Sequence, residues 1–364
     1  MENKPQTTTK ERLLSLDLLR GLTVAGMILV NNGYGESFAM LQHSRWNGMT
    51  PCDLVFPFFL FIMGISCYLS LSKCGFKPSR DVLTKVLRRT TLLFAIGLFI
   101  NWFHEAVKGD VLCFDHLRVW AVMQRIALCY FFVSVFALFC NHRHTTTAIV
   151  ALLVAYTLII IFGDGYSEDP EANVLARADR WVFGYEHLYH KSPVDPEGLL
   201  GTIAATAHVL LGFYCGKVIK QGKDLGQKIT GLFAVGTILL LAGYLLSYGL
   251  PLNKRIWSPS YVFVSCGLAA LLQALIMYIV DMGGHRRLTT PLRVFGVNAL
   301  ALYVASELLA IIFGRLGINT LIYNGLHAVI VPAEWASLAY AATFVGINYL
   351  IGYALYRRGI FIKL

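Results

Sequence analysis

Residues 30–64 of this chain read VNNGYGESFAMLQHSRWNGMTPCDLVFPFFLFIMG, a polar loop between two apolar runs. Thr50 and Asp53 have the spacing of a helix start, with a proline between them at the first helical position. Residues 54–71 then form an apolar run long enough to span a bilayer. His43 is therefore predicted at the rim of a membrane helix. Because histidine exchanges its proton near neutral pH, we look there first for chemistry.

The remainder of the chain alternates apolar runs with short polar segments. Hydrophobic residues make up 56% of its 364 residues and charged residues only 14%, too little charge to cover a soluble globule of this size. The sequence therefore predicts an all-α polytopic membrane protein, a bundle of about ten transmembrane helices of about 20 residues each, in a single domain over residues 1–364. The apolar connection 314–332 is expected at the interface as a short helix or re-entrant piece. The expected spans are 18–34, 54–71, 86–103, 119–140, 145–162, 199–219, 229–248, 261–280, 292–313 and 333–356.

Basic residues indicate the orientation of these helices. Lys and Arg gather in 73–89, 217–228, 286–293 and 357–363, and the positive-inside rule places these segments and both termini in the cytoplasm, with His43 on the periplasmic side. The net charge of +10 comes in these short clusters without a nucleic-acid motif, so the expected partner is the lipid bilayer and not nucleic acid. The first apolar run has no small-residue cleavage signature and is expected to remain as an uncleaved helix.

The cysteines indicate neither a disulfide framework nor a metal centre. None of the eight forms a CxxC pair, and several fall in or beside apolar runs. We expect them to be structural and expect no metal cofactor.

The motif HxxWNGxTxxDLVFPFFLFIMG, following RGLTVAGMILVNNG, resembles the heparan-α-glucosaminide N-acetyltransferase family of transmembrane acyltransferases, which includes bacterial inner-membrane members. The similarity extends over nearly the whole chain, although the large N-terminal luminal domain of the animal enzyme is expected to be absent. The further matching segments are QRIALCY at 124–130, DPEGLLGT at 195–202, PLNKRIWSPSY at 251–261, FGVNALALYVASE at 295–307 and GIFIKL at 359–364.

The resemblance implies an acetyltransferase of a bacterial inner membrane. It would move an acetyl group from cytosolic acetyl-CoA to the amine of an amino sugar, with glucosamine as the first choice, at the periplasmic side. His43 aligns with the family's catalytic histidine and would act as general base. Asn31 would donate a hydrogen bond to the oxyanion of the tetrahedral intermediate. This chain has one residue more between that asparagine and His43 than the animal pattern, which leaves Asn32 as an alternative. Either asparagine could simply cap its helix. Asp53 would orient His43 or bind the sugar ammonium, and a capping role alone would also explain it.

The acceptor is expected to meet an acidic, aromatic and amide-rich surface. Residues 163–198 form an acidic loop that would attract a cationic amine, although a solvated loop, or a helix cap at Asp195, would account for it equally. Trp257 suits either sugar stacking or the membrane rim. The candidate acceptor-binding residues are Trp46, Asn47, Asp195, Glu197, Asn253, Lys254, Trp257 and Glu307.

The donor is expected to bind through scattered cations, since the sequence has no Gly-rich phosphate loop. By resemblance Lys363 suits the phosphates of coenzyme A, and Arg20 is on the same cytoplasmic face. Gln124 and Arg125 are polar residues inside an apolar span, where a partner or a wet cavity is the usual reason for them. The candidate cofactor-binding residues are Lys363, Arg20, Gln124, Arg125 and Asn298.

Several alternatives remain open at this stage. Transfer could be direct in a ternary complex or pass through an acetyl-histidine, and we favour the direct route. A transporter of N-acetylglucosamine would need no chemistry, but transporters usually carry pseudo-symmetric repeats that this sequence does not show. An O-acetyltransferase for envelope glycans is a third candidate. The oligomeric state is also open, with a homodimer as one option.

Overall fold

The structure is a computed structural model that describes residues 13–189, 191–287 and 289–362. Within these ranges the regular secondary structure is helical, without a strand. The α-helices are α1 (Leu14–Asn31), α2 (Val55–Leu71), α3 (Arg80–Lys108), α4 (Val122–Phe139), α5 (Thr145–Phe162), α6 (Val174–Phe183), α7 (Gly201–Gln221), α8 (Leu225–Ser247), α9 (Pro259–Ile276), α10 (Thr289–Val297), α11 (Ala299–Leu316), α12 (Ile318–His327) and α13 (Ala333–Arg357). The short 3-10 helices are η1 (Ala39–Leu41), η2 (Pro51–Leu54), η3 (Ser72–Cys74), η4 (Cys113–Asp115), η5 (His142–His144) and η6 (Tyr185–His187), and the π-helix η7 (Met277–Met282) continues α9.

In the described ranges, nine helical segments are long and apolar enough to cross a membrane. The prediction of an all-α polytopic membrane protein is therefore confirmed. Helix α3 covers the span expected at 86–103 but is not among the nine, and its 29 residues carry charge in both the first and the last turn. The nine segments are Leu14–Asn31, Pro51–Cys74, Val122–Phe139, His142–Phe162, Gly201–Gln221, Leu225–Ser247, Pro259–Met282, Ala299–Leu316 and Ala333–Arg357.

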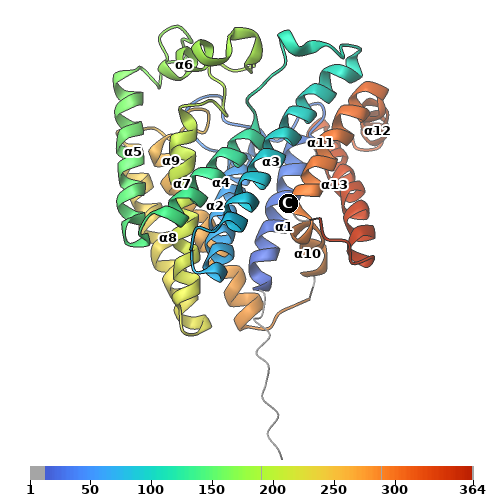
Figure 1. Ribbon diagram of the computed structural model, residues 1–364. Coiled ribbons are helices and arrows are strands. Elements are labelled where there is room, and N and C mark those ends of the chain that lie inside the picture. The colour runs from blue at the N-terminus through green and yellow to red at the C-terminus, as the bar shows by residue number, and fades with distance from the viewer. Residues whose placement is uncertain (1–12, 190, 288, 363–364) are drawn as a thin grey trace, which may run out of the picture.

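The helices form one bundle whose two ends differ. Figure 1 shows α6 and its neighbouring loops at one end and the start of α1 at the opposite end, with α5 and α13 at the two flanks. The connection expected at 314–332 contains the short helix α12, as predicted.

The single helix expected at 292–313 is wrong, because the chain breaks at Asn298 into α10 and α11. The Asn298 side chain accounts for the break by binding another backbone segment. Its Nδ2 donates to the carbonyl of Ile360 at 3.0 Å, and its Oδ1 accepts from the N–H of Ile362 at 2.9 Å. A buried carboxamide with both functions satisfied in this way holds the chain after α13 against the break.

Glycines let two helix pairs approach at backbone distance. A Cβ on Gly64 of α2 would lie 2.1 Å from the carbonyl of Val209 in α7, and a Cβ on Gly212 would lie 2.1 Å from that of Phe61. Helices α1 and α10 cross in the same way through Gly21 and Gly296. Small residues at such crossings are typical of membrane helices, where close packing drives association.

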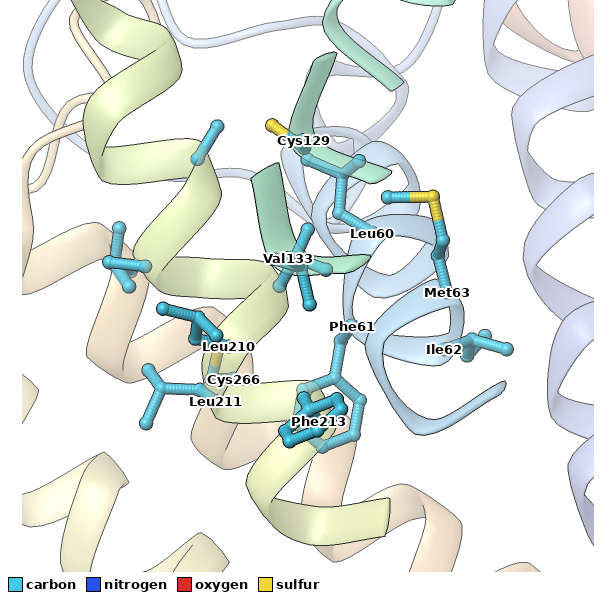
Figure 2. Close-up of a cluster of buried hydrophobic side chains, with 14 of the residues drawn as sticks. Leu60, Phe61, Ile62, Met63, Cys129, Val133, Leu210, Leu211, Phe213 and Cys266 are labelled. Atoms are coloured by element: carbon cyan, nitrogen blue, oxygen red, sulfur yellow. The ribbon is translucent and has the colours of Figure 1, made fainter. Parts of the chain in front are cut away.

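The main core lies between α2, α4, α7 and α9. Figure 2 shows buried side chains from these helices gathered in one cluster. This core surrounds the first turns of α2 and so supports the polar loop that precedes it. The labelled residues are Leu60, Phe61, Ile62, Met63, Cys129, Val133, Leu210, Leu211, Phe213 and Cys266.

Candidate functional site

A cavity of about 940 Å³ brings together segments that are far apart in the sequence. It is lined from the end of α1, the loop before α2, the end of α3, the loop after η6, the loop before α9, and α11. Six of the residues singled out from the sequence line it: Asn31, His43, Asp53, Glu197, Lys254 and Glu307.

His43 and Asp53 form the most closely bonded pair in this cavity. His43 Nδ1 lies 2.8 Å from Asp53 Oδ1. The His43 side chain is 46% exposed whereas that of Asp53 is fully buried, so a ligand can reach the imidazole but not the carboxylate. Since Asp53 accepts from Nδ1–H, the tautomer we assign leaves the Nε2 lone pair for proton transfer.

Asp53 also caps the helix start, as the spacing of Thr50 and Asp53 predicts. Its Oδ2 accepts from the backbone N–H of Thr50 at 3.0 Å and from that of Ser44 at 3.1 Å. One carboxylate oxygen thus fixes the loop while the other holds His43. The capping and orienting interpretations are therefore compatible, because they use different oxygens of the same group.

Lys254 reaches the same pair from the other half of the chain. Its Nζ lies 3.0 Å from His43 Nδ1, 3.4 Å from His43 Nε2 and 3.5 Å from Asp53 Oδ1. The loop that carries Lys254 is tied to the His43 loop by a hydrogen bond from Gly48 N to Leu252 O at 2.7 Å. The sequence placed Lys254 at a sugar or membrane-rim site, whereas the structure places its ammonium beside the imidazole.

Cys52 is a neighbour of His43 that the sequence analysis did not single out. Its Sγ lies 3.1 Å from His43 Nδ1. The residue is buried and does not line the cavity. A buried cysteine in a loop without a CxxC partner carries no sequence signal, so only the fold brings this thiol to the ring.

The structure distinguishes Asn31 from Asn32. Asn32 Nδ2 donates to the carbonyl of Ile28 at 2.8 Å, so this side chain caps its own helix. Asn31 instead lines the cavity, where its side chain interacts with that of Glu307 from α11. Asn31 is therefore the asparagine that can reach a ligand in the cavity.

Asp195 and Glu197 are already paired with a cation of this chain. Arg118 Nη2 lies 2.8 Å from Asp195 Oδ1 and 3.0 Å from Glu197 Oε2. Burial raises the pKa of the Asp195 carboxyl above its usual value, an effect that the nearby Arg118 guanidinium opposes. Arg118 lies in a loop with no motif, so only the fold reveals that it meets these carboxylates.

The cavity lining is basic, in contrast to the acidic surface expected from residues 163–198. Six Lys and Arg residues line it against three carboxylates. Within the described ranges, Asp53 is paired with Lys254 and Glu197 with Arg118. Glu307 is the third cavity carboxylate and has no cationic partner there, so it is available to an amine. The six basic residues are Lys108, Arg118, Lys191, Lys254, Arg255 and Arg315.

Four other predicted acceptor residues lie beside the site without lining the cavity. Asn253 Nδ2 donates to Asn47 Oδ1 at 3.2 Å, which adds to the contact between the two loops. Trp46 is buried and its Nε1 donates to the carbonyl of Tyr166 at 2.9 Å. Trp257 is only 1% exposed and packs edge-on against Phe56, so it has no face for a sugar and does not lie at the interface.

Gln124 and Arg125 are buried in α4 and do not line this cavity. Arg125 Nη2 donates to the carbonyl of Gly198 at 2.9 Å, and its guanidinium lies 5.1 Å from the Trp257 ring. Gln124 packs against Gly97, where a Cβ would lie 2.5 Å from its Oε1. These contacts support the start of α7 and the crossing of α3 with α4.

Two further predicted cofactor residues, Arg20 and Asn298, do not line the cavity. Arg20 in α1 binds Asp17 Oδ1 at 3.0 Å and Ser66 Oγ at 2.9 Å. Asn298 is occupied by the backbone of 360–362, as described above. Lys363 lies outside the described residues.

Comparisons with known proteins indicate one family for this chain. The family model described as heparan-alpha-glucosaminide N-acetyltransferase, catalytic, matches residues 12–169, which include His43, Asp53 and Arg118. Heparan-alpha-glucosaminide N-acetyltransferase of Mus musculus is 30% identical over 365 residues, which cover 84% of this chain and 55% of that protein. The protein of the same name from Homo sapiens is 28% identical over 415 residues, which cover 97% of this chain and 60% of that protein. The chain thus spans little more than half the length of these relatives.

Proposed function

Because this chain belongs to the heparan-alpha-glucosaminide N-acetyltransferase family, we propose that it transfers the acetyl group of acetyl-CoA to the amine of an amino sugar. The observation that carries the proposal is the cavity in which the exposed imidazole of His43, held by Asp53, meets Asn31 and Glu307. An acyl transfer to nitrogen needs a base that takes the amine proton and a hydrogen-bond donor that stabilises the oxyanion. A histidine and an asparagine can supply these two functions.

His43 is the general base of the proposed reaction. With Nδ1–H donating to Asp53, Nε2 accepts a proton from the attacking nitrogen as the new C–N bond forms. The ammonium of Lys254 lies 3.4 Å from Nε2, beside the nitrogen that takes up the proton. The protonated ring then gives its proton to the departing coenzyme A sulfur, so that free thiol is released and His43 is regenerated.

Asn31 and Glu307 act on the two reacting groups. The Asn31 carboxamide donates to the oxygen of the tetrahedral intermediate. Glu307 is the cavity carboxylate without a cationic partner among the described residues, and it receives the amine of the acceptor. We propose direct transfer in a ternary complex with glucosamine as the acceptor, the cavity facing the periplasm of a bacterial inner membrane and acetyl-CoA entering from the cytoplasm.

The proposal is tested with purified protein, acetyl-CoA and a panel of amino sugars. Release of free thiol, together with a mass gain of one acetyl group on glucosamine, is expected. N-acetylglucosamine is the matched control acceptor, because its nitrogen is already acylated and should release no thiol. If no sugar is acetylated while proteoliposomes accumulate labelled N-acetylglucosamine, the protein is a transporter and the proposal is wrong.

A further inference from the structure

Pro57 removes one possible backbone donor for the carbonyl of Asp53. In an α-helix the N–H of each residue binds the carbonyl four residues earlier, and the residue four after Asp53 is a proline, which has no N–H. Asp53 belongs to the 3-10 helix η2, directly before α2, and is fully buried. The α-helical bond therefore cannot form at this carbonyl, and a donor from another part of the fold can bind there instead.

Tyr261 supplies that donor from a different helix. Its hydroxyl donates to the Asp53 carbonyl at 2.6 Å, and the whole tyrosine is buried. Tyr261 lies in the first turn of α9, where the Ser258 side chain caps the helix and Pro259 occupies its first position. The hydroxyl is therefore presented by a rigid element and not by a mobile loop.

The same carbonyl belongs to the residue whose side chain holds His43. A shift of the Asp53 backbone would displace Oδ1 from His43 Nδ1, and the 2.8 Å contact between them depends on that position. Tyr261 and Lys254 lie only seven residues apart, so one segment of the chain contacts both the Asp53 backbone and the His43 ring. Among the described residues, Tyr261 is the side-chain donor to this carbonyl.

We propose that Tyr261 is a positioning residue, whose hydroxyl replaces the N–H that Pro57 lacks and thereby holds the Asp53 carboxylate against His43. This inference rests on the proposed function of His43 as the base. It also assigns a purpose to a buried tyrosine that touches neither the cavity nor any reacting group.

The pair of residues offers a direct rescue experiment. Tyr261→Phe removes the donor and should lower kcat roughly ten-fold, the effect of one lost hydrogen bond, with KM for acetyl-CoA and glucosamine within a few-fold of the starting protein. Pro57→Ala restores an N–H four residues after Asp53, so the double variant should regain most of the lost kcat. A double variant no better than Tyr261→Phe alone would overturn the proposal, and so would a Tyr261→Phe protein with normal kcat.

Tyr156→Phe is the matched control. Tyr156 is also a fully buried tyrosine whose hydroxyl donates to a backbone carbonyl, that of Ile256. Whatever loss this variant shows, Pro57→Ala should not repair it. Equal repair of both tyrosine variants would mean that Pro57→Ala stabilises the protein generally, which would overturn the specific role of Tyr261.

A second measurement separates this proposal from the proposed function. The ¹³C chemical shifts of the His43 ring are followed by NMR with ¹³C-labelled histidine at one fixed pH, the signals being assigned by their loss in His43→Gln. The groups that face the ring are Asp53, Lys254 and Cys52. Weaker contact with Asp53 in Tyr261→Phe should move these signals from their positions in the starting protein, and Pro57→Ala should move them back.

The two measurements together have distinct outcomes. His43 signals that move and are restored, in a protein that acetylates no sugar, support the positioning role and remove the proposed function. Unchanged His43 signals in an active enzyme overturn the positioning role alone. If Tyr261→Phe fails to fold, the double variant decides, because the restored N–H should recover the folded protein, and failure to do so overturns the proposal.

Discussion

Arg118 and Asp195 lie 77 residues apart in the chain, yet Nη2 of the guanidinium is 2.8 Å from Oδ1 of the carboxylate. Glu197 shares the same nitrogen at 3.0 Å. The contact joins the loop after α3 to the loop before α7, at the edge of the cavity. Arg118 thus pairs with both of the carboxylates that the sequence assigned to a cationic acceptor.

Replacing Arg118 should destabilise the protein strongly. In Arg118→Leu the buried Asp195 carboxylate loses its cationic partner, and such a loss costs about 3–5 kcal/mol. The free energy of unfolding in detergent, measured by chemical denaturation, should fall by that order. Arg45→Leu, at an exposed position of the His43 loop, is the control. Equal stability of the two variants would contradict the pairing.

Lys254 should contribute to turnover. Its ammonium lies 3.0 Å from His43 Nδ1 and 3.5 Å from Asp53 Oδ1, so it helps to hold the carboxylate that orients the ring. In Lys254→Met that contact is lost, and kcat should fall roughly ten-fold, the effect of one lost charge-assisted contact. Lys254→Arg keeps the charge and should stay close to the starting protein. Normal kcat in Lys254→Met would show that Lys254 does not act on the His43–Asp53 pair.

Asp179 should make stability depend on pH. Burial raises the pKa of its carboxyl to about 7, nearby Asp195 adds to this effect, and the N–H of Leu199 opposes it. Between its unfolded value near 4 and about 7, the folded protein holds a proton that the unfolded chain has released. The contribution of the Asp179 carboxyl to the free energy of unfolding is therefore fully present below about pH 4. It is lost as the pH rises through 7.

The measurement is the unfolding midpoint of Asp179→Asn and of the starting protein between pH 5 and pH 8. The amide stays neutral, so the variant should lose less stability between pH 5 and pH 8, by at most about 3 kcal/mol. Parallel pH dependence of the two proteins would show that the Asp179 carboxyl does not hold a proton in this range.

Gly64 should be intolerant of a side chain. The Cβ of alanine would lie 2.1 Å from the Val209 carbonyl and would force α2 away from α7. Overpacking of this kind costs about 1–3 kcal/mol, so the unfolding midpoint of Gly64→Ala should fall. Gly346→Ala in α13 is the control, because its Cβ would meet nothing within 4 Å. Similar midpoints for both variants would contradict the close crossing.

The sidedness of the cavity can be tested by labelling. Glu186 lies at η6 and Lys223 in the turn between α7 and α8, and both are exposed. By the positive-inside rule, a cysteine at 186 should react with an impermeant reagent added from the periplasm, and one at 223 should not. Intact cells and lysed cells are compared to show that both cysteines are reactive. The reverse pattern would reverse the proposed direction of transfer.

The sequence alone determined the features that depend on local order. Composition and the length of the apolar runs gave the membrane-spanning helices, because a helix in lipid must satisfy its own backbone. The Thr50–Asp53 spacing gave the helix start before α2, since a cap is made within one turn. His43 could be singled out because its motif lies in one short loop.

Tertiary structure decided which of the other polar residues reach that loop. Arg118, Lys254 and Tyr261 meet their partners across 77 to 211 residues, and no periodicity or motif encodes such distances. Trp257 looks the same in sequence whether its ring lies at a membrane rim, against a sugar or in the core, where the structure places it. Asn298 was predicted to bind the cofactor, and only the structure shows that its side chain binds the backbone of 360–362 instead. The physical reason is the same in each case, since burial and pairing are properties of the neighbours in space and not of the neighbours in the chain.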